Sequence, residues 1–453
     1  MENKLTRKYG LLTATCMVVG TVIGSGIFFR NENIIAVVGG NLWIAIAAWL
    51  TGGFVTLSAA YVFSVLATRH EKVGGLVDYS EALLGERYGF MFGWFMAVIF
   101  YSAMGGLLAW VSGRFTVELF GWDVDIFHSP QTYMFAAVYL VSIFAINALS
   151  PKLAGKFQVS TAFIKLVPLI AMGIVGTLLG IRNGVTLENL NSTFVAVASD
   201  NPFLRATIYT VFAYMGWDTV LSLNSEVKNS KRNLPIALIG GMLVVMAIYV
   251  LYTVGIFSSA SLEALSASGG VLSAFQGAFG AIGGPALLAF IIVSCLGALN
   301  GITITSQRYF YSMAVRGRGI SPKTFSQVDP NTNAATNAAI LYLLFAAGWM
   351  MVNGGNRAGW YGDIVFDIMG FVPITFQALL IPLYFWVIFK EKDLGVFNRF
   401  IAPSVAIAGS LFLVYAIVIN HGTRVFWYVG AFIVLMGAGA IVMLRSERRQ
   451  KNS

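Results

Sequence analysis

Residues 18–29 read VVGTVIGSGIFF, an apolar run that is interrupted near its centre by Gly24, Ser25 and Gly26. A second apolar run is interrupted in the same way at residues 212–218, which read FAYMGWD. In lipid, a broken helix leaves backbone N–H and C=O groups unpaired, at a cost of roughly several kcal/mol each. Such a break is tolerated where protein, water or a ligand satisfies these groups. Two breaks at corresponding positions of two halves of the chain therefore indicate the binding site of a transported solute.

The composition predicts a polytopic membrane protein. Of the 453 residues, 57% are hydrophobic and 11% are charged, which is more apolar surface than a soluble protein of this length can bury. A membrane span needs about 20 apolar residues, and we count twelve such segments. They cover residues 9–30, 42–65, 88–111, 133–149, 159–181, 204–225, 234–257, 285–315, 337–352, 364–389, 401–419 and 425–444. We expect one transmembrane domain over residues 1–453, in which the longest polar stretches are short loops such as 183–201 and 258–270.

The first apolar segment and the positions of the Cys and His residues argue against a secreted, a disulfide-linked and a metal- or haem-binding protein. The first apolar segment is too long for a cleavable signal peptide and lacks a small-residue cleavage site. Cys16 and Cys295 both fall inside predicted spans and indicate no disulfide framework. His70, His128 and His421 fall in predicted loops, so no histidine set for haem or zinc lies in the membrane. We expect no cofactor and no metal.

The net charge of +9 is explained by orientation in the membrane and does not indicate a nucleic-acid partner. Most Lys and Arg residues fall at the ends of alternate spans, which is the pattern of cytoplasmic loops. We therefore expect a multi-pass protein of the cell (inner) membrane with both termini in the cytoplasm, as an even number of spans requires.

The two breaks divide the chain into two repeats of five spans. The first repeat covers residues 9–181 and the second 204–389, while the two extra spans lie within 401–444. An odd number of spans per repeat forces the second copy to be inverted relative to the first. This inversion brings both breaks together near the midplane of the membrane.

The Gly24-Ser25-Gly26 break has two interpretations. Glycine permits close backbone approach, and the half-helix that starts near Ile27 presents free N–H groups and a positive dipole end, which suit a carboxylate. Ser25 adds a hydroxyl donor. The alternative interpretation is close helix packing through small residues.

Several motifs resemble one transporter family. Residues 21–28 (TVIGSGIF) are similar to the first-span signature of the amino acid–polyamine–organocation (APC) superfamily. Five further motifs resemble a bacterial-type member of the L-amino-acid transporter (LAT) branch. They are residues 72–79 (KVGGLVDY), 212–217 (FAYMGW), 226–229 (EVKN), 233–235 (NLP) and 294–301 (SCLGALNG). The motifs occur in the right order from the first to the eighth span. They are specific for the family and only weakly specific for the substrate.

The resemblance implies an all-α, LeuT-like fold with twelve transmembrane helices, a 5+5 inverted repeat and broken helices 1 and 6. It also implies alternating access and an α-amino-acid site between the broken spans. In such a site Ser25, Gly26 and Ile27 bind the substrate carboxylate. Carbonyl groups near the residues Val22, Phe212, Ala213 and Met215 accept from the ammonium, Phe212 closes over the substrate as an aromatic lid, and Ile302 lines the side-chain pocket. For Phe212, the alternative is an ordinary core or lipid-facing aromatic residue.

Lys165 lies about ten residues into the fifth predicted span, roughly 15 Å deep at the helical rise. An intramembrane lysine is costly and is usually functional; the alternative is a side chain that extends to the cytoplasmic edge. The resemblance implies that Lys165 occupies the place that a sodium ion has in sodium-coupled relatives, and connects span 5 to the broken span 1 and to span 8. This favours sodium-independent transport, with Gly24 and Phe212 as further conformational residues.

Asp218 departs from the LAT pattern, which usually has a neutral residue at this position. Burial disfavours a charged carboxylate unless it is paired. Asp218 can hold a cationic substrate tail, act as a protonation switch, or pair with a structural partner. Met215 points to neutral substrates, because an acid at that position favours cationic ones.

We therefore expect a sodium-independent exchanger of neutral, small L-amino acids. A cationic amino acid or polyamine antiporter and a proton-coupled symporter remain alternatives. No zinc, nucleophile-elbow or phosphate-loop motif is present, so we expect no enzyme. The loop at residues 112–132 has no cysteine, so we expect no disulfide-linked heavy subunit; the expected partners are the amino acid substrate and the lipid bilayer. We do not favour a signalling receptor, because the chain has no cytoplasmic domain large enough to signal alone. We do not favour a channel either, because a channel does not need an aromatic lid.

Overall fold

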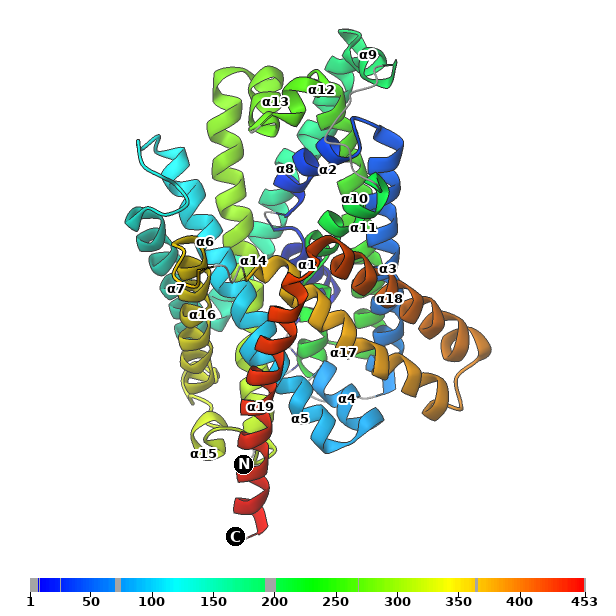
Figure 1. Cartoon of the computed structure of the whole chain (residues 1–453). Coiled ribbons are helices and arrows are strands. Elements are labelled where there is room, and N and C mark those ends of the chain that lie inside the picture. The colour runs from blue at the N-terminus through cyan, green and yellow to red at the C-terminus, as the bar shows by residue number, and fades with distance from the viewer. Residues whose placement is uncertain are drawn as a thin grey trace.

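The computed structural model describes residues 7, 9–24, 26–69, 75–191, 201–267, 269–362 and 366–451. Over these residues the chain is helical, and its one strand-like pairing is an isolated bridge between Tyr9 and Val227. Figure 1 shows long helices that cross the molecule from one end to the other. Short helices α9, α12 and α13 lie at one end, which we call the outer end, and α4, α5 and α15 lie at the opposite end, which we call the basic end (Figure 1).

The long and broken helices supply the framework. They are α1 (Leu11–Val22), α2 (Gly26–Val37), α3 (Leu42–Arg69), α5 (Glu86–Trp94) continued by the π-helical η1 (Phe95–Phe100) and α6 (Tyr101–Leu119), α7 (Pro130–Leu149), α8 (Pro151–Arg182), α10 (Pro202–Ala213), the 3₁₀ segment η2 (Trp217–Glu226), α11 (Ser230–Ser259), α14 (Gly283–Val315), α16 (Thr336–Arg357), α17 (Ile368–Lys390), α18 (Ala402–His421) and α19 (Arg424–Lys451).

Short elements connect them. They are α4 (Leu76–Leu84), α9 (Val185–Asn191), α12 (Leu262–Ser266), α13 (Gly270–Phe279), η3 (Gly280–Ile282), α15 (Pro322–Phe325) and η4 (Phe397–Ile401). Two of them correct the sequence analysis: α9 and α12 are helices inside segments that we expected to be loops.

Ten helices of the described residues are long and apolar enough to cross a membrane. The bent pair α1 and α2, inclined by 50° to each other, raises the number to eleven. The pair α10 and η2 occupies the place of the expected sixth span, but it is too short and irregular to be counted by the same criteria. A total of twelve spans therefore stays a prediction, while the multi-pass helical architecture is confirmed.

Short sequence signals start several of these helices. Ser129, Ser150 and Asn201 each precede a proline, and the side chain of each accepts a hydrogen bond from the N–H three residues later. This is the arrangement of an N-cap residue followed by proline at the first helical position, where the missing N–H costs nothing. The starts of α7, α8 and α10 are thus encoded locally.

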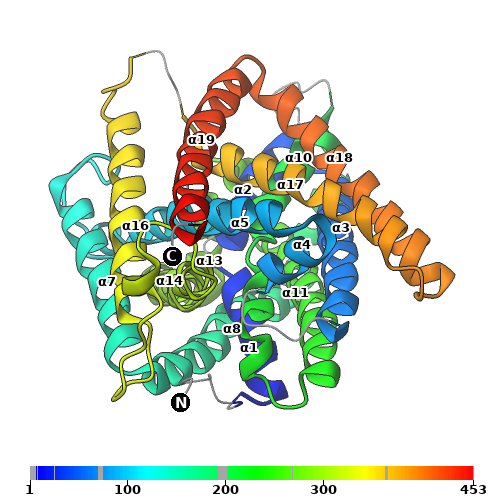
Figure 2. The ribbon, with the colours of Figure 1, turned by 90° about the horizontal axis from the view of Figure 1, so that it is seen from below.

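Burial separates central from peripheral helices. Every residue from 95 to 113, in η1 and α6, is buried, whereas Phe426 and Val434 of α19 are 78% and 71% exposed. Figure 2, viewed from the basic end, shows α14 and α5 within the bundle and α7, α18 and α19 toward its margin. Exposed apolar side chains on the marginal helices suit contact with lipid.

Close approach of α8 and α11 is made possible by glycine. A Cβ atom on Gly176 would lie 2.5 Å from the carbonyl oxygen of Gly255, and one on Gly255 would lie 2.3 Å from the carbonyl oxygen of Met172. Small residues at such interfaces allow backbones to approach within van der Waals contact.

Candidate functional site

The first break lies between α1 and α2. The helix α1 ends at Val22, and Ile23 is already extended, with φ −74° and ψ 96°. The helix α2 begins again at Gly26. Ser25 lies outside the described residues, so its predicted contact with a carboxylate stays a prediction.

The second break lies between α10 and η2. Gly216 has φ +99°, a left-handed conformation that glycine adopts without steric cost. A Cβ atom there would lie 2.9 Å from Cγ2 of Thr21, and one on Gly26 would lie 3.0 Å from Cα of Ala213. The two breaks are therefore in direct contact with each other, as the inverted arrangement of spans predicts.

Lys165 lies fully buried beside the first break. Its Nζ donates to the carbonyl oxygens of Gly20 at 2.6 Å, Ile23 at 2.5 Å and Ser294 at 3.1 Å. The hydroxyl of Ser294 also donates to the carbonyl oxygens of Ile23 and Gly24, both at 3.3 Å. One ammonium group thus binds backbone carbonyls of α1 and α14 from its position on α8.

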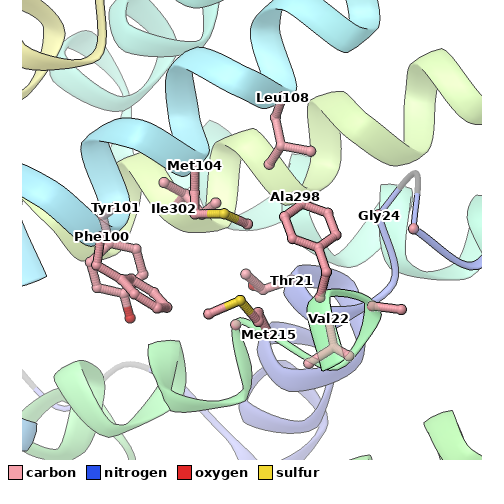
Figure 3. A pocket seen from close by; sticks show the side chains of 14 residues that line it. Thr21, Val22, Gly24, Phe100, Tyr101, Met104, Leu108, Met215, Ala298 and Ile302 are labelled. Carbon is pink, nitrogen blue, oxygen red and sulfur yellow. The ribbon is translucent and has the colours of Figure 1, made fainter. Parts of the chain in front are cut away.

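A small cavity lies between the breaks; we call it the central cavity. It is lined by Thr21, Val22, Gly24, Gly26, Phe100, Tyr101, Met104, Leu108, Phe212, Ala213, Met215, Gly216, Ala298 and Ile302. Figure 3 shows Phe100, Tyr101, Met104 and Leu108 on one side, facing Thr21, Val22 and Met215 on the other. No charged side chain lines this cavity among the described residues.

Most of the predicted site residues meet here, and some do not. Ile27 and Asp218 are fully buried and do not line the central cavity. Lys165 lies behind the cavity wall, as a residue that holds the break would. The predicted lid residue Phe212 lines the cavity, and the Arg30 guanidinium carbon lies 5.7 Å from the centroid of its ring.

Asp218 has a partner that the sequence did not indicate. The hydroxyl of Tyr101 donates a hydrogen bond to its Oδ2, and the Tyr101 ring lies 5.4 Å from that of Tyr309. Tyr101 lines the central cavity while Asp218 does not. The tyrosine thus separates the carboxylate from the cavity in this structure.

Residues of α6 and α11 were missed by the sequence analysis. Tyr249 donates to the carbonyl oxygens of Ala213 at 2.9 Å and Val22 at 3.4 Å, two carbonyls that we expected to face a substrate ammonium. A carbonyl oxygen has two lone pairs, so each can still accept a second donor. A tyrosine in the middle of a span is the signal that was available, because its hydroxyl needs a partner in lipid.

Thr21 contributes a polar atom to the cavity wall. Its hydroxyl is buried and has no hydrogen-bond partner among the described residues. A buried polar atom without a partner is costly, and this oxygen packs against Gly301 of α14, where a Cβ atom would lie 2.4 Å from it. Over the described residues, no group of three His, Cys, Asp or Glu side chains is placed to hold a metal ion.

Ion pairs connect several helices at the basic end of the molecule. Glu226 at the end of η2 pairs with Arg308 of α14 at 2.7 Å, and both are largely buried. Arg316 pairs with Asp78 and with Glu81, the latter at 3.1 Å. The N–H of Tyr9 donates to the carbonyl oxygen of Glu226 at 3.0 Å. The start of α1, the end of η2, α4 and α14 are joined at this end of the molecule.

Comparison with known proteins gives a consistent result. A family model described as amino acid permease matches residues 9–444. The serine/threonine exchanger SteT of Bacillus subtilis (strain 168) is 30% identical over 420 residues, which are 91% of this chain and 91% of the relative. The human cystine/glutamate transporter is 26% identical, over 86% of this chain and 76% of its own length. The mouse b(0,+)-type amino acid transporter 1 is 24% identical, over 95% of this chain and 87% of its own length.

Among solved structures, MhsT in complex with L-phenylalanine superposes with a TM-score of 0.60. The match covers 91% of this chain and 100% of the MhsT chain at 16% sequence identity. At this identity the likeness is one of fold.

Proposed function

The chain belongs to the amino acid permease family of the APC superfamily and has the LeuT-like fold, and we propose that it is a sodium-independent exchanger of small neutral L-amino acids. Its relatives in the LAT branch are named as amino acid transporters, and the Bacillus subtilis relative is named as an exchanger. Amino acid transport across a membrane is therefore the activity of the chain. The substrate class and the independence from sodium are the parts that we propose.

The observation that carries the proposal is the lining of the central cavity. Because the cavity has no charged side chain among the described residues, a charged substrate tail would lose its hydration without a compensating partner. Among the described lining residues, the hydroxyl of Thr21 lacks a hydrogen-bond partner, and we propose that it pairs with a substrate hydroxyl. A small side chain with or without a hydroxyl, as in alanine or serine, suits this wall. The Bacillus relative is named as a serine/threonine exchanger.

Binding of the amino acid's common groups uses the two breaks. The N–H groups at the start of α2, with Ser25, Gly26 and Ile27, receive the carboxylate. The carbonyl groups near Val22, Phe212, Ala213 and Met215 receive the ammonium. Phe212 then closes over the substrate from the outer side.

Independence from sodium is proposed from Lys165. Three carbonyl oxygens within 3.1 Å of its Nζ already have the amino group of this lysine as their partner. A sodium ion at the same place would meet electrostatic repulsion from the ammonium. The lysine therefore holds the broken helix in position without a transported cation.

We further propose that both termini lie in the cytoplasm and that the protein resides in the cell (inner) membrane without a disulfide-linked heavy subunit. Figure 1 shows α19 ending at the basic end, and Tyr9, just before α1, pairs with Glu226 at the same end, where a positive-inside orientation puts the cytoplasm. The two repeats are proposed to be residues 9–181 and 204–389.

A cationic amino acid or polyamine antiporter is the second candidate, because Asp218 lies next to the cavity wall. The hydrogen bond from Tyr101 favours the structural interpretation of this carboxylate in the present structure. If Tyr101 turned away, Asp218 would reach a cationic tail. A proton-coupled symporter is the third candidate and uses the same carboxylate.

The test compares two external substrates. Liposomes containing the protein are loaded with L-serine and offered labelled L-serine or labelled L-arginine. We expect serine to exchange and arginine to exchange at least tenfold more slowly, because the cavity offers no counter-charge. Exchange of arginine or of a polyamine alone would contradict the neutral substrate class.

A further inference from the structure

One wall of the central cavity comes from a helix that changes its winding beside the cavity. The π-helical η1 connects α5 to α6, and the N–H of Tyr101 donates to the carbonyl oxygen of Met96, five residues earlier. Phe100, the last residue of η1, and Tyr101, the first of α6, both line the central cavity. Short π-helical turns inside α-helices are rare and frequently lie at functional sites.

This turn brings two neighbouring aromatic rings to the same wall. On a regular α-helix, neighbouring side chains point about 100° apart, and residues four positions apart share a face, as Phe100, Met104 and Leu108 do here. A π-helical turn contains more residues than an α-helical one, so the rotation between neighbours is smaller and Tyr101 joins that face. The ring centroids of Phe100 and Tyr101 are 4.9 Å apart, and Figure 3 shows both residues on one side of the cavity.

Side chains donate to the carbonyl groups of this turn. Where π-helical bonding gives way to α-helical bonding, the extra residue leaves a carbonyl group without its usual backbone donor. The hydroxyl of Ser102 donates to the carbonyl oxygen of Ala97 at 2.6 Å. Nε1 of Trp349, on α16, donates to the carbonyl oxygen of Val98 at 2.7 Å. Both donors are buried, and a buried carbonyl group that loses its donor is costly.

The helix α16 holds this donor in place from behind the cavity wall. It contributes none of the described residues that line the central cavity. It approaches α6 closely, since a Cβ atom on Gly106 would lie 2.6 Å from the carbonyl oxygen of Ala346. The Trp349 ring stacks on two others, with centroids 6.0 Å from Phe366 and 6.1 Å from Phe371. Its N–H therefore reaches η1 from a fixed position.

We propose that Trp349 is a positioning residue of the substrate site, whose hydrogen bond to Val98 holds η1 in the form that places Phe100 and Tyr101 on the cavity wall. Trp349 does not line the cavity and acts through the turn. The inference rests on the proposed use of the central cavity as the amino acid site. It does not depend on which amino acid is carried or on whether sodium or protons take part.

The first test measures KM and maximal rate separately. Trp349→Phe keeps a ring for stacking and removes the donor. Exchange is measured in liposomes with labelled L-serine, L-alanine, L-leucine and L-arginine, and the comparison uses the amino acid that the wild type exchanges fastest. We expect KM to rise about fivefold, because the wall that binds substrate is formed in a smaller fraction of the molecules, and the maximal rate per folded protein to stay within about twofold.

Trp94→Phe is the matched control. Nε1 of Trp94, on α5, donates to the carbonyl oxygen of Leu435 at 3.0 Å, and Trp94 does not line the central cavity. Loss of a merely structural bond lowers the amount of folded protein and leaves KM unchanged, which we expect for this control. An unchanged KM in Trp349→Phe, or an equal rise in both variants, would overturn the proposal. Absence of serine exchange in the wild type would instead contradict the proposed substrate class.

The second test asks whether Trp349 acts through η1. Ser102→Ala removes the other side-chain donor of the same turn. Combined with Trp349→Phe, it should raise KM by less than the product of the two single effects, because a turn that is already lost cannot be lost again. Combined with Trp94→Phe, the effects should multiply. Effects that multiply in both pairs would overturn the proposal. If Trp349→Phe does not fold, benzothienylalanine in place of Trp349 keeps the shape of the ring, lacks the N–H and gives the same readouts.

Discussion

At the scale of single residues, Lys165 is the side chain on which the broken helix depends. Its burial is costly for an ammonium group, and its three short bonds to carbonyl oxygens offset that cost. The same bonds satisfy carbonyl groups that the end of α1 would otherwise leave unpaired in a membrane. The lysine and the break therefore stabilise each other.

Replacing Lys165 with methionine removes the charge while keeping much of the volume. Each carbonyl left buried without a donor costs about 1–3 kcal/mol, so we expect a lower unfolding temperature and at least a tenfold loss of exchange. Flux is measured in liposomes and unfolding in the same detergent. Lys156→Met, on the exposed face of the same helix, is the control. Wild-type flux and stability in Lys165→Met would refute this role.

Phe212 lines the central cavity, and the Arg30 guanidinium lies over its ring, which is the position that the proposed lid role needs. We expect Phe212→Ala to speed the release of bound L-serine about tenfold, because the cavity loses its cover, while the unfolding temperature falls only slightly for a partly buried ring. Phe163→Ala removes a lipid-facing ring that is 53% exposed and should change neither quantity. Unchanged release and flux in Phe212→Ala would remove the lid role.

Asp218→Asn tests which interpretation of the carboxylate holds. An amide oxygen can still accept the hydrogen bond of Tyr101, so we expect L-serine exchange to stay within about threefold of wild type and arginine to stay excluded. The measurement is the ratio of serine to arginine exchange at two pH values. A large change in that ratio, or loss of an existing pH dependence, would show that the charge of Asp218 takes part in transport.

Three of the cavity-lining residues that sequence reasoning missed come from one helix. Tyr101, Met104 and Leu108 lie on a helix that is buried all round, and such a helix has no apolar stripe from which a pocket-facing side can be recognised. The breaks were predicted because a broken helix leaves backbone groups unpaired in lipid, so glycine and serine inside an apolar run indicate a special site. The positions of the two breaks were therefore predictable, whereas side chains contributed by an unbroken buried helix were not.

At the scale of elements, the ends of η2 and α14 are joined by the pair of Glu226 and Arg308, whose side chains are 0% and 12% exposed. This pair fixes the segment after the second break to a helix that lines the central cavity. Breaking it leaves a buried charge without its partner.

We expect Glu226→Gln to lower the free energy of unfolding by about 3–5 kcal/mol. The comparable change Glu447→Gln breaks an ion pair with Arg87, which is 74% exposed, and should cost less than about 1 kcal/mol. Denaturant unfolding of both variants in one detergent compares them. Equal losses in the two variants would contradict the view that burial makes the first pair important.

The starts of several helices could be predicted from the sequence, whereas the short helices could not. A serine or asparagine before proline marks the starts of α7, α8 and α10. The five-residue α12 and the seven-residue α9 lie in segments expected to be loops, because so few residues carry no recognisable period. The π-helical η1 was also missed, since one extra residue in a continuous apolar run leaves no trace in composition.

At the scale of the whole molecule, family, helical class and LeuT-like fold were predictable from two breaks and a set of motifs in order. The number of spans stays a prediction, because α10 and η2 form a broken span of which neither half is long enough to cross a membrane. Substrate choice depends on how side chains from α6, α14 and the breaks enclose one cavity. That enclosure is a property of the assembled bundle and not of any one segment.

Sodium-independent exchange is the central claim, and counterflow tests it most directly. Labelled L-serine uptake is measured in sodium-free buffer into liposomes that are either empty or loaded with unlabelled L-serine. We predict rapid uptake into loaded liposomes, none above background into empty ones, and no change when sodium is added, because Lys165 already supplies the positive charge beside the first break. Equal uptake into empty liposomes, or uptake that appears only with a sodium or proton gradient, would contradict the account.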